Sequence, residues 1–161
     1  MTIETRDITK SEIGIIKPLW EALNRMHLAD SVHFKEHYRA FTFERRLEGL
    51  LGTADADMKI TVAFSGEVPL GYCASKAEGG SGEIESLFLD ESIRGLGVGG
   101  TLVDSHVAWM RERGCARIRV SVSHGHDSPL DFYRKHGFRE RLTVLELKDA
   151  GTPGDGGNAD A

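Results

Sequence analysis

Two carboxylates and a group of glycines lie close together in one stretch of the chain, where they suggest an acid/base group beside an anion site. Glu83 and Glu85 flank Ile84 in an apolar segment that extends to Leu89 and is typical of a buried strand. The glycines that follow are Gly95, Gly97, Gly99 and Gly100. Glycines allow tight turns and let backbone N–H groups approach an anion, and a helix that starts there adds its unpaired first-turn donors and positive dipole end. The stretch therefore predicts a site for a phosphorylated ligand next to a proton acceptor.

The surrounding segments predict the sheet and helices that position this stretch. Residues 58–64 and 68–77 have a hairpin pattern that continues through a glycine-rich loop into the strand at Ile84, so we expect an antiparallel meander. Residues 117–122 alternate polar and apolar side chains after an intervening helix, so this strand should run parallel to the one at Ile84. The other expected elements are a strand at 3–7, a helix from Ser11 to Met26 made irregular by Pro18, helices at 44–51 and 128–135, and a final strand or hairpin at 138–148.

Length and composition favour one domain with its own core, since the chain has 161 residues and 40% of them are apolar. We expect this domain to span residues 1–148 and the Gly- and Asp-rich residues 149–161 to be a disordered tail. The formal charge of −5 disfavours a broad nucleic-acid or anionic-membrane surface. No apolar run approaches the roughly 20 residues of a membrane helix, and the start lacks a signal-peptide pattern, so we expect the cytoplasm. Cys73 and Cys115 are expected to be buried free thiols.

Other ligand classes fit the same residues less well. Residues 95–100 match the dinucleotide pattern G-x-G-x-x-G, but the acidic residue expected about 20 positions later is missing, as are the lysine and Ser/Thr of a P-loop. Residues 27–51 are rich in histidine and aromatic side chains, for which a substrate-facing lid, simple packing and a metal site all stay open. His124 and His126 offer a second metal alternative without the further ligand spacing of a hydrolase site. We expect no metal.

Two motifs together resemble the GNAT family of N-acetyltransferases. Arg94-Gly95-Leu96-Gly97-Val98-Gly99 resembles that family's R/Q-x-x-G-x-G/A motif, and Phe132-Tyr133-Arg134-Lys135-His136-Gly137-Phe138 resembles its later Y-x-x-x-G-F element. The resemblance covers residues 83–138 closely and the preceding meander loosely. It implies an α/β (α+β) fold: a single GNAT-like domain whose central mixed, mostly antiparallel sheet is flanked by helices. One parallel strand pair in that sheet would be splayed around acetyl-coenzyme A.

The resemblance also implies where acetyl-coenzyme A binds. Backbone groups of the strand end at Leu87, Phe88 and Leu89 would pair with the acetyl carbonyl and the pantetheine arm. The residues that would wrap the pyrophosphate, mainly with backbone N–H groups, are Arg94, Gly95, Leu96, Gly97, Val98, Gly99, Gly100 and Thr101. His126 stands where the family often has an asparagine, and His126 and Ser128 are expected to contact the pantetheine or phosphate region.

Catalytic roles follow from the same resemblance. An alkylamine with a pKa of about 10.4 is mostly protonated at neutral pH. A carboxylate is therefore a sensible acceptor for the proton that the amine must lose before it attacks. Glu85 matches the glutamate of many small-molecule members and is the first choice, Glu83 matches the base of the histone-modifying branch, and a role for neither stays open. Tyr133 matches the tyrosine near the coenzyme sulfur, where a phenol can donate to a developing thiolate, with a packed helical tyrosine as the alternative. A backbone N–H near Leu89 would polarise the acetyl carbonyl.

The function implied is an acetyl-coenzyme A-dependent N-acetyltransferase that transfers the acetyl group to a primary amine by direct attack in a ternary complex. The expected acceptor is a small-molecule amine, with an aminoglycoside or a polyamine among the candidates. A protein N-terminus or a lysine is an alternative acceptor, and a non-catalytic acyl-coenzyme A sensor is an alternative from another class. Neither a nucleic-acid nor a membrane partner is expected, and a homodimer stays open.

Overall fold

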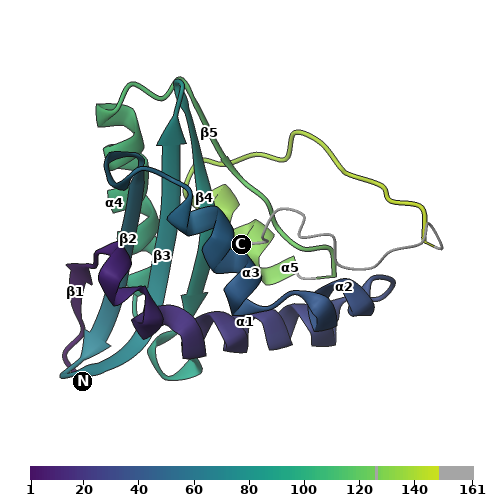
Figure 1. Ribbon diagram of the computed structural model, residues 1–161, viewed down its shortest axis with the longest axis horizontal. Coiled ribbons are helices and arrows are strands. Elements are labelled where there is room, and N and C mark those ends of the chain that lie inside the picture. Colours follow the sequence, from purple (N-terminus) through teal and green to yellow (C-terminus); the bar gives the residue numbers. More distant parts are fainter. Residues whose placement is uncertain (126, 149–161) are drawn as a thin grey trace.

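The computed structural model describes residues 1–125 and 127–148, without the side chain of Asp127 (Figure 1). The predicted tail at 149–161 and the predicted contact of His126 lie outside the described residues. The strands are β1 (Glu4–Asp7), β2 (Met58–Ser65), β3 (Val68–Glu78), β4 (Ser81–Leu89) and β5 (Arg117–Val120). The α-helices are α1 (Lys17–Asp30), α2 (Lys35–Ala40), α3 (Phe43–Leu51), α4 (Val98–Glu112) and α5 (Asp127–Lys135), and the 3-10 turns are η1 (Lys10–Ile16), η2 (Asp55–Asp57) and η3 (Glu91–Ile93).

The five strands form one mixed sheet in the order β1-β2-β3-β4-β5. All neighbours are antiparallel except β4 and β5, which are parallel as the intervening helix α4 predicted. These two strands pair only from Ser81 to Ile84 on β4, whereas β4 continues to Leu89 in contact with β3. The edge of β4 beyond Ile84 therefore has no strand partner within the described chain. The predicted fold class, with its divergent parallel pair, is confirmed.

Helices cover both faces of this sheet, and each layer buries its own apolar cluster (Figure 1). On one face α1 and α3 pack on β2, β3 and β4 through residues such as Trp20, Phe43 and Tyr72. On the other face α4 and α5 pack through residues such as Val103 and Tyr133. The middle strands β2, β3 and β4 are thus covered on both faces, and the centre of each is buried, unlike the exposed β1 and the alternating β5.

The first predicted helix, Ser11 to Met26, is two pieces in the structure. A 3-10 turn, η1, ends at Ile16, and α1 begins at Lys17 with Pro18 in its first turn and runs to Asp30. Proline suits that position because its missing N–H would have no partner there in any case. The chain therefore changes helix type just before the proline, and α1 extends four residues past the predicted end.

The predicted final strand or hairpin at 138–148 is wrong for the described structure. Residues 139–147 have no regular secondary structure, and their apolar side chains are exposed. Alternating apolar residues such as Leu142 and Val144 predicted a strand from local pattern alone. A strand needs a partner edge, and the chain's exit from α5 does not bring these residues to one.

A buried polar network ties α4 to the sheet. His106 on α4 is fully buried, with Nδ1 2.7 Å from Ser75 Oγ and Nε2 2.9 Å from Thr61 Oγ1. Thr61 donates its single hydroxyl hydrogen to Asp7 Oδ1 at 2.6 Å, so Nε2 of His106 carries the ring proton and Nδ1 accepts from Ser75. Burial, together with nearby Lys59 and against the attraction of Asp7, lowers the pKa of His106 to about 3. The imidazole is therefore neutral at physiological pH.

This network predicts an acid sensitivity of folding. Below pH 6.5 the unfolded chain protonates His106 and the folded chain does not, so stability that is complete at neutral pH should fall by up to about 1.4 kcal/mol per pH unit between pH 6 and pH 4. Urea unfolding at several pH values measures this slope. His106→Gln keeps an amide between the same hydroxyls but cannot titrate, so its slope should be shallower. Equal slopes in the wild type and His106→Gln would show that protonation of His106 does not cause the acid sensitivity.

Candidate active site

The glycines after β4 are required for two different reasons. Gly95 and Gly97 have φ of 79° and 82°, in the left-handed region, and Gly97 is the residue that precedes α4. Gly99 and Gly100 instead allow close contact, since an added Cβ would lie 3.0 Å from Leu89 Cδ1 and 2.9 Å from His136 Cε1 respectively. A side chain at any of these positions would strain the turn or displace the residue packed on it.

Six of the residues 94–101, a range which we call the cradle, line a cavity of about 560 Å³. That volume lies in the usual range for small-molecule sites. In the first turn of α4 the N–H of Thr101 bonds Gly97 O, which leaves the N–H groups of Val98, Gly99 and Gly100 without a partner in the helix. The lining residues are Leu89, Arg94, Gly95, Gly97, Gly99, Gly100, Thr101, Asp104, Phe132 and His136. The cavity therefore combines free backbone donors, a helix N-terminus and a cation, which suits an anionic group.

Arg94 is held at the junction between β4 and the cradle. Its Nε donates to Leu89 O at 2.9 Å, and its guanidinium lies 5.7 Å from the centre of the Phe88 ring. A third contact joins Nη2 to Met26 Sδ at 3.5 Å. Arg94 lines the cavity and forms no ion pair with a carboxylate of residues 1–125 and 128–148, so its charge is available to a ligand.

His136 and Asp104 belong to the same cavity and were not predicted from the sequence. His136 Nδ1 lies 3.0 Å from Asp104 Oδ1, and its ring lies above Gly100 in the first turn of α4. Asp104 is four residues after Gly100 on α4, whereas His136 directly follows the end of α5. The spacing of Gly100 and Asp104 was a usable signal, but the contact between α4 and the end of α5 could not be read from it.

The other residues predicted to bind coenzyme A lie in different environments. Leu96 is exposed, Val98 packs into the apolar cluster under α4, and the Thr101 hydroxyl donates to Gly97 O at 3.1 Å. Leu87 packs under the sheet with α4 and α5, whereas Phe88 belongs to the opposite cluster with α1 and α3. Ser128 is exposed in the first turn of α5 and is not among the residues that line the cavity.

Glu85 is the extra residue of a β-bulge, and its carboxylate forms two ion pairs. Ser86 pairs with Ala74 and Ile84 with Ser75, so Glu85 has no residue opposite it on β3. Its carboxylate lies 3.3 Å from Arg46 Nη2 of α3, which also donates to the Glu85 carbonyl at 3.0 Å. Lys76 Nζ lies 3.7 Å from the other carboxylate oxygen. Two cations therefore compete for the lone pairs that a base would need.

Glu83 has a different environment. Its nearest cation in the described chain is Arg119 on β5, whose Nη2 lies 3.9 Å from the Glu83 carboxylate. Burial and, after it, the negative charge of Glu85 raise the pKa of Glu83, against the opposing effects of Arg119, Arg46 and Lys76. Of the two carboxylates, Glu83 is the one that the geometry leaves able to take up a proton.

Tyr133 is buried beneath the sheet, in one cluster with Cys73 and Leu87. Its ring meets Phe132 at 5.1 Å and Phe138 at 5.5 Å between centroids, both in edge-on geometry. Burial, with a smaller contribution from Cys73, raises the pKa of Tyr133 well above its usual value. The phenol thus keeps its proton at neutral pH, and its hydroxyl can donate a hydrogen bond.

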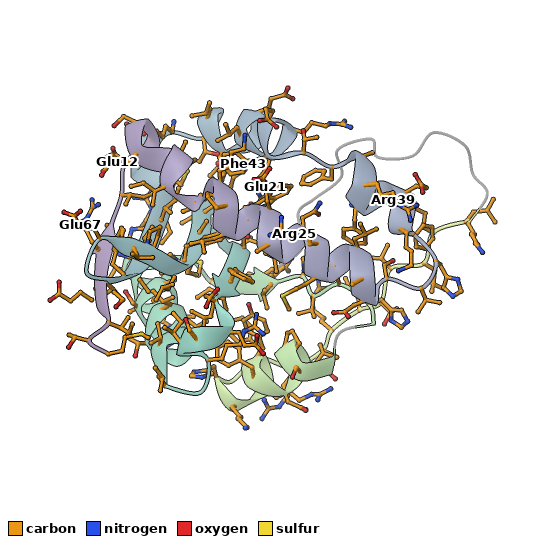
Figure 2. All side chains as sticks on the ribbon, turned by 90° about the horizontal axis from the view of Figure 1, so that it is seen from below. Glu12, Glu21, Arg25, Arg39, Phe43 and Glu67 are labelled. Carbon is orange, nitrogen blue, oxygen red and sulfur yellow. The ribbon has the colours of Figure 1, made fainter. Side chains whose placement is uncertain are left out.

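The aromatic segment between α1 and α3 is closely packed. Asn24 Nδ2 donates to Tyr38 O at 2.8 Å, and His37 stacks on Phe41 with 5.8 Å between ring centroids. The space enclosed there, about 10 Å³, holds little more than one water. Tyr38 Oη also lies 2.9 Å from Ser123 Oγ, which joins α2 to the loop after β5. Figure 2 shows α1, with Glu21 and Arg25, running alongside this segment. The close packing favours a structural role for the segment.

The described residues contain neither a cluster of metal-ligating side chains nor a membrane-spanning helix. Among residues 1–125 and 127–148, no group of three or more His, Cys, Asp or Glu side chains could hold a metal ion. Cys73 and Cys115 are free thiols, the first buried and the second half-buried. None of the helices described is long and apolar enough to cross a membrane.

Comparison with known proteins identifies the family. The model described as the acetyltransferase (GNAT) family matches residues 19–138. A Bacillus subtilis protein with acetyltransferase in its name is 28% identical over 87 residues, which are 54% of this chain and only 57% of that protein's length. The PaiA N-acetyltransferase of Thermoplasma acidophilum, solved with coenzyme A, superposes with a TM-score of 0.75 at 19% identity over 89% of this chain and 94% of that one.

A second solved structure has the same fold. The aminoglycoside N-acetyltransferase AAC(6')-Iy, solved with a bisubstrate analogue, has a TM-score of 0.65 at 18% identity over 91% of this chain and 97% of that one. The chain belongs to the GNAT acetyltransferase family. The family indicated by the two sequence motifs is confirmed.

Proposed function

We propose that the protein is an N-acetyltransferase that uses acetyl-coenzyme A to acetylate a small primary amine by direct attack in a ternary complex. The observation that carries this proposal is the position of the cradle at the Leu89 end of the part of β4 that has no β5 partner, with the half-buried Glu83 at the other end, where β5 stops pairing. An acyl donor held there would present its acetyl group between free backbone groups and a proton acceptor. Family membership supports the acyl transfer.

The described residues fit coenzyme A. The N–H groups of Val98, Gly99 and Gly100 and the cation of Arg94 would bind the pyrophosphate, as glycines at a helix start do for other phosphates. We add His136 to this set, because its Nδ1 donates to Asp104 and this contact holds Nε2 above Gly100, where an imidazolium ring would donate to a phosphate oxygen. The free edge of β4 from Glu85 to Leu89 would bond the pantetheine arm. Bound acetyl-coenzyme A would supply the activated acetyl group and a thiolate leaving group.

Glu83 is the base that the geometry supports, in place of the first choice from sequence, Glu85. A base gains from a raised pKa and from weak pairing with cations. The pKa of Glu83 is raised and its one ion pair is with exposed Arg119 at 3.9 Å, whereas Glu85 has two cations, at 3.3 and 3.7 Å. Glu85, clamped by Arg46 and Lys76, would instead hold the bulge and raise the pKa of Glu83 through its charge. Glu83 would thus accept the proton from the amine, directly or through a water molecule.

Tyr133 would return a proton to the departing sulfur. Its burial keeps the phenol protonated, and it lies in the same cluster as Leu87 of β4, on the side of the sheet covered by α4 and α5. The base and the acid would therefore act from opposite faces of the split between β4 and β5. A pair of groups placed in this way can take and give protons in the same turnover.

The function is tested by measuring acetyl-coenzyme A binding and thiol release with a panel of amines. Calorimetry should show binding, and Arg94→Glu should weaken it about tenfold or more by placing an anion beside the pyrophosphate. Arg111→Glu makes the same charge reversal at the far end of α4 and serves as the control. The panel should include polyamines, amino sugars, aminoglycosides and peptide amines. Tight binding with no thiol release from any amine would favour the sensor alternative, and no binding would overturn the proposal.

A comparison of the two carboxylates tests the assignment of the base. Glu83→Gln should lower kcat/KM about 10²-fold or more with unchanged coenzyme affinity, and it should abolish the acidic limb of the pH–rate profile. Glu85→Gln should keep that limb while losing stability, because Arg46 is left buried without its counter-ion. If instead Glu85→Gln loses the limb and Glu83→Gln keeps it, the roles are the reverse of those proposed.

Replacing Tyr133 by phenylalanine, which removes only the hydroxyl oxygen, tests the proposed proton donor. Tyr133→Phe should preserve the ring packing and the thermal midpoint, while kcat falls about 10²-fold with unchanged binding of acetyl-coenzyme A. Single-turnover thiol release separates this loss from slow product release. An unchanged rate of the chemical step would assign Tyr133 to packing alone.

A further inference from the structure

A row of alternating charges crosses three strands of the sheet. Glu83 of β4 lies opposite Lys76 of β3 and opposite Arg119 of β5 in the strand register. The residue that follows each of them in the chain packs in the cluster with α4 and α5; these are Ala77, Ile84 and Val120. Because side chains alternate along a strand, the row points to the other face, where α1 and α3 lie. Glu83 is therefore flanked by a cation on each neighbouring strand.

The charges around Glu83 add up to an excess of positive charge. The groups that act on it electrostatically are the cations Arg119, Arg46 and Lys76 and the carboxylate of Glu85. With both carboxylates ionised, these five side chains carry three positive and two negative charges. The formal charge of the whole chain is −5, so this positive excess is a local feature of the site.

Lys76 and Arg119 are the two cations that a small molecule can reach. Lys76 Nζ lies 3.7 Å from Glu85 and Arg119 Nη2 lies 3.9 Å from Glu83, both beyond hydrogen-bond distance. The side chains of Lys76 and Arg119 are 28% and 46% exposed, and that of Glu83 is 23% exposed. Arg46, in contrast, is buried and donates to Glu85. Lys76 and Arg119 thus keep N–H donors available beside the proposed base.

An amine that gives its proton to Glu83 has to lie against this row, a step that rests on the proposed function. A second ammonium group on the same molecule would be repelled by Lys76 and Arg119. A carboxylate would be attracted, and the planar guanidinium of Arg119 offers paired N–H donors that match it. Neighbouring strands lie about 5 Å apart, so an amine at Glu83 and an anion beside the next strand have the separation of a short amino acid.

We propose that the acceptor is a small amino acid whose amine binds at Glu83 and whose carboxylate binds Arg119 and Lys76. These two cations set a preference for acceptors with an anionic group over polyamines and aminoglycosides, which carry several positive charges. The bound carboxylate would also draw Arg119 away from Glu83 and leave Glu83 a stronger base. Recognition of the acceptor and activation of the base would then come from the same contact.

Matched acceptors that differ only in the anionic group test this preference. Among the common α-amino acids and β-alanine, the best acceptor should have a kcat/KM for thiol release about tenfold or more above that of its carboxamide, because the carboxamide loses charge-assisted hydrogen bonds. Phosphoethanolamine and ethanolamine make the same comparison for a phosphate. A larger preference for the phosphate than for any carboxylate would overturn the amino acid as the acceptor.

Substitutions in the row test which residues cause the preference. Arg119→Gln should raise KM for the amino acid about tenfold, with a smaller effect on its carboxamide. Arg119→Glu should reverse the preference, so that a diamine becomes the better acceptor. Arg117→Gln removes the same charge two residues earlier on β5, opposite Ser81, and should keep the wild-type preference. If Arg119→Gln and Lys76→Gln both keep the wild-type preference, these residues do not bind the acceptor.

Calorimetry of the protein saturated with coenzyme A separates this proposal from the proposed function. The amino acid should bind more tightly than its carboxamide, and Arg119→Glu should abolish the difference. If this result is found but no acceptor releases thiol, the amino-acid site stands and the proposed function is wrong. If amines release thiol but a carboxylate adds neither affinity nor rate, the proposed function stands and the amino-acid acceptor is overturned. Amino acids that neither bind nor react also overturn it.

Discussion

The site depends on one constraint of the sheet: β5 stops pairing with β4 after Ile84, while β4 continues to Leu89 beside β3. Backbone groups that would be used up in a continuous ladder are left free along this part of β4. The cradle begins a few residues further on, and the first turn of α4 points its own free N–H groups to the same place. The chain thereby gathers unpaired backbone donors without burying them beside another strand, which is what a polar, elongated ligand requires.

The bulge at Glu85 explains why two adjacent carboxylates differ. A bulged residue loses its place in the ladder, and here Arg46 of α3 donates to the Glu85 carbonyl. The guanidinium is itself buried, so a counter-ion must accompany it, and the Glu85 carboxylate supplies one at 3.3 Å. Arg46 Nε is the only buried side-chain N or O atom in the described residues without a hydrogen bond. Glu85 therefore contributes to the stability of the bulge, which leaves Glu83 as the carboxylate that we propose as the base.

The elements that sequence reasoning predicted well are those specified by local residues. The β2–β3–β4 meander, the parallel β5 and the glycine turn before α4 follow from alternation, turn residues and one intervening helix. Local patterns do not encode contacts between residues far apart in the sequence. The contact of Arg46 with the bulge at Glu85 spans 39 positions, and the His136–Asp104 contact spans 32. The same reasoning failed at residues 139–147, because alternation specifies a strand-forming segment and says nothing about which edge is available to it.

Two buried polar residues fix the helices on the two faces of the sheet relative to the point where β4 and β5 separate. His106 joins α4 to β2 and β3 on one face, and Arg46 joins α3 to β4 on the other. Each is desolvated and each has specific partners, so a shift of either helix would leave a polar group without its hydrogen bond at a cost of about 1–3 kcal/mol. Apolar packing alone would tolerate small sliding movements of these helices. The hydrogen bonds of His106 and Arg46 do not, and they keep the cradle on α4 at a constant distance from Glu83 on β4. Proton transfer from a bound amine to Glu83 would depend on that distance.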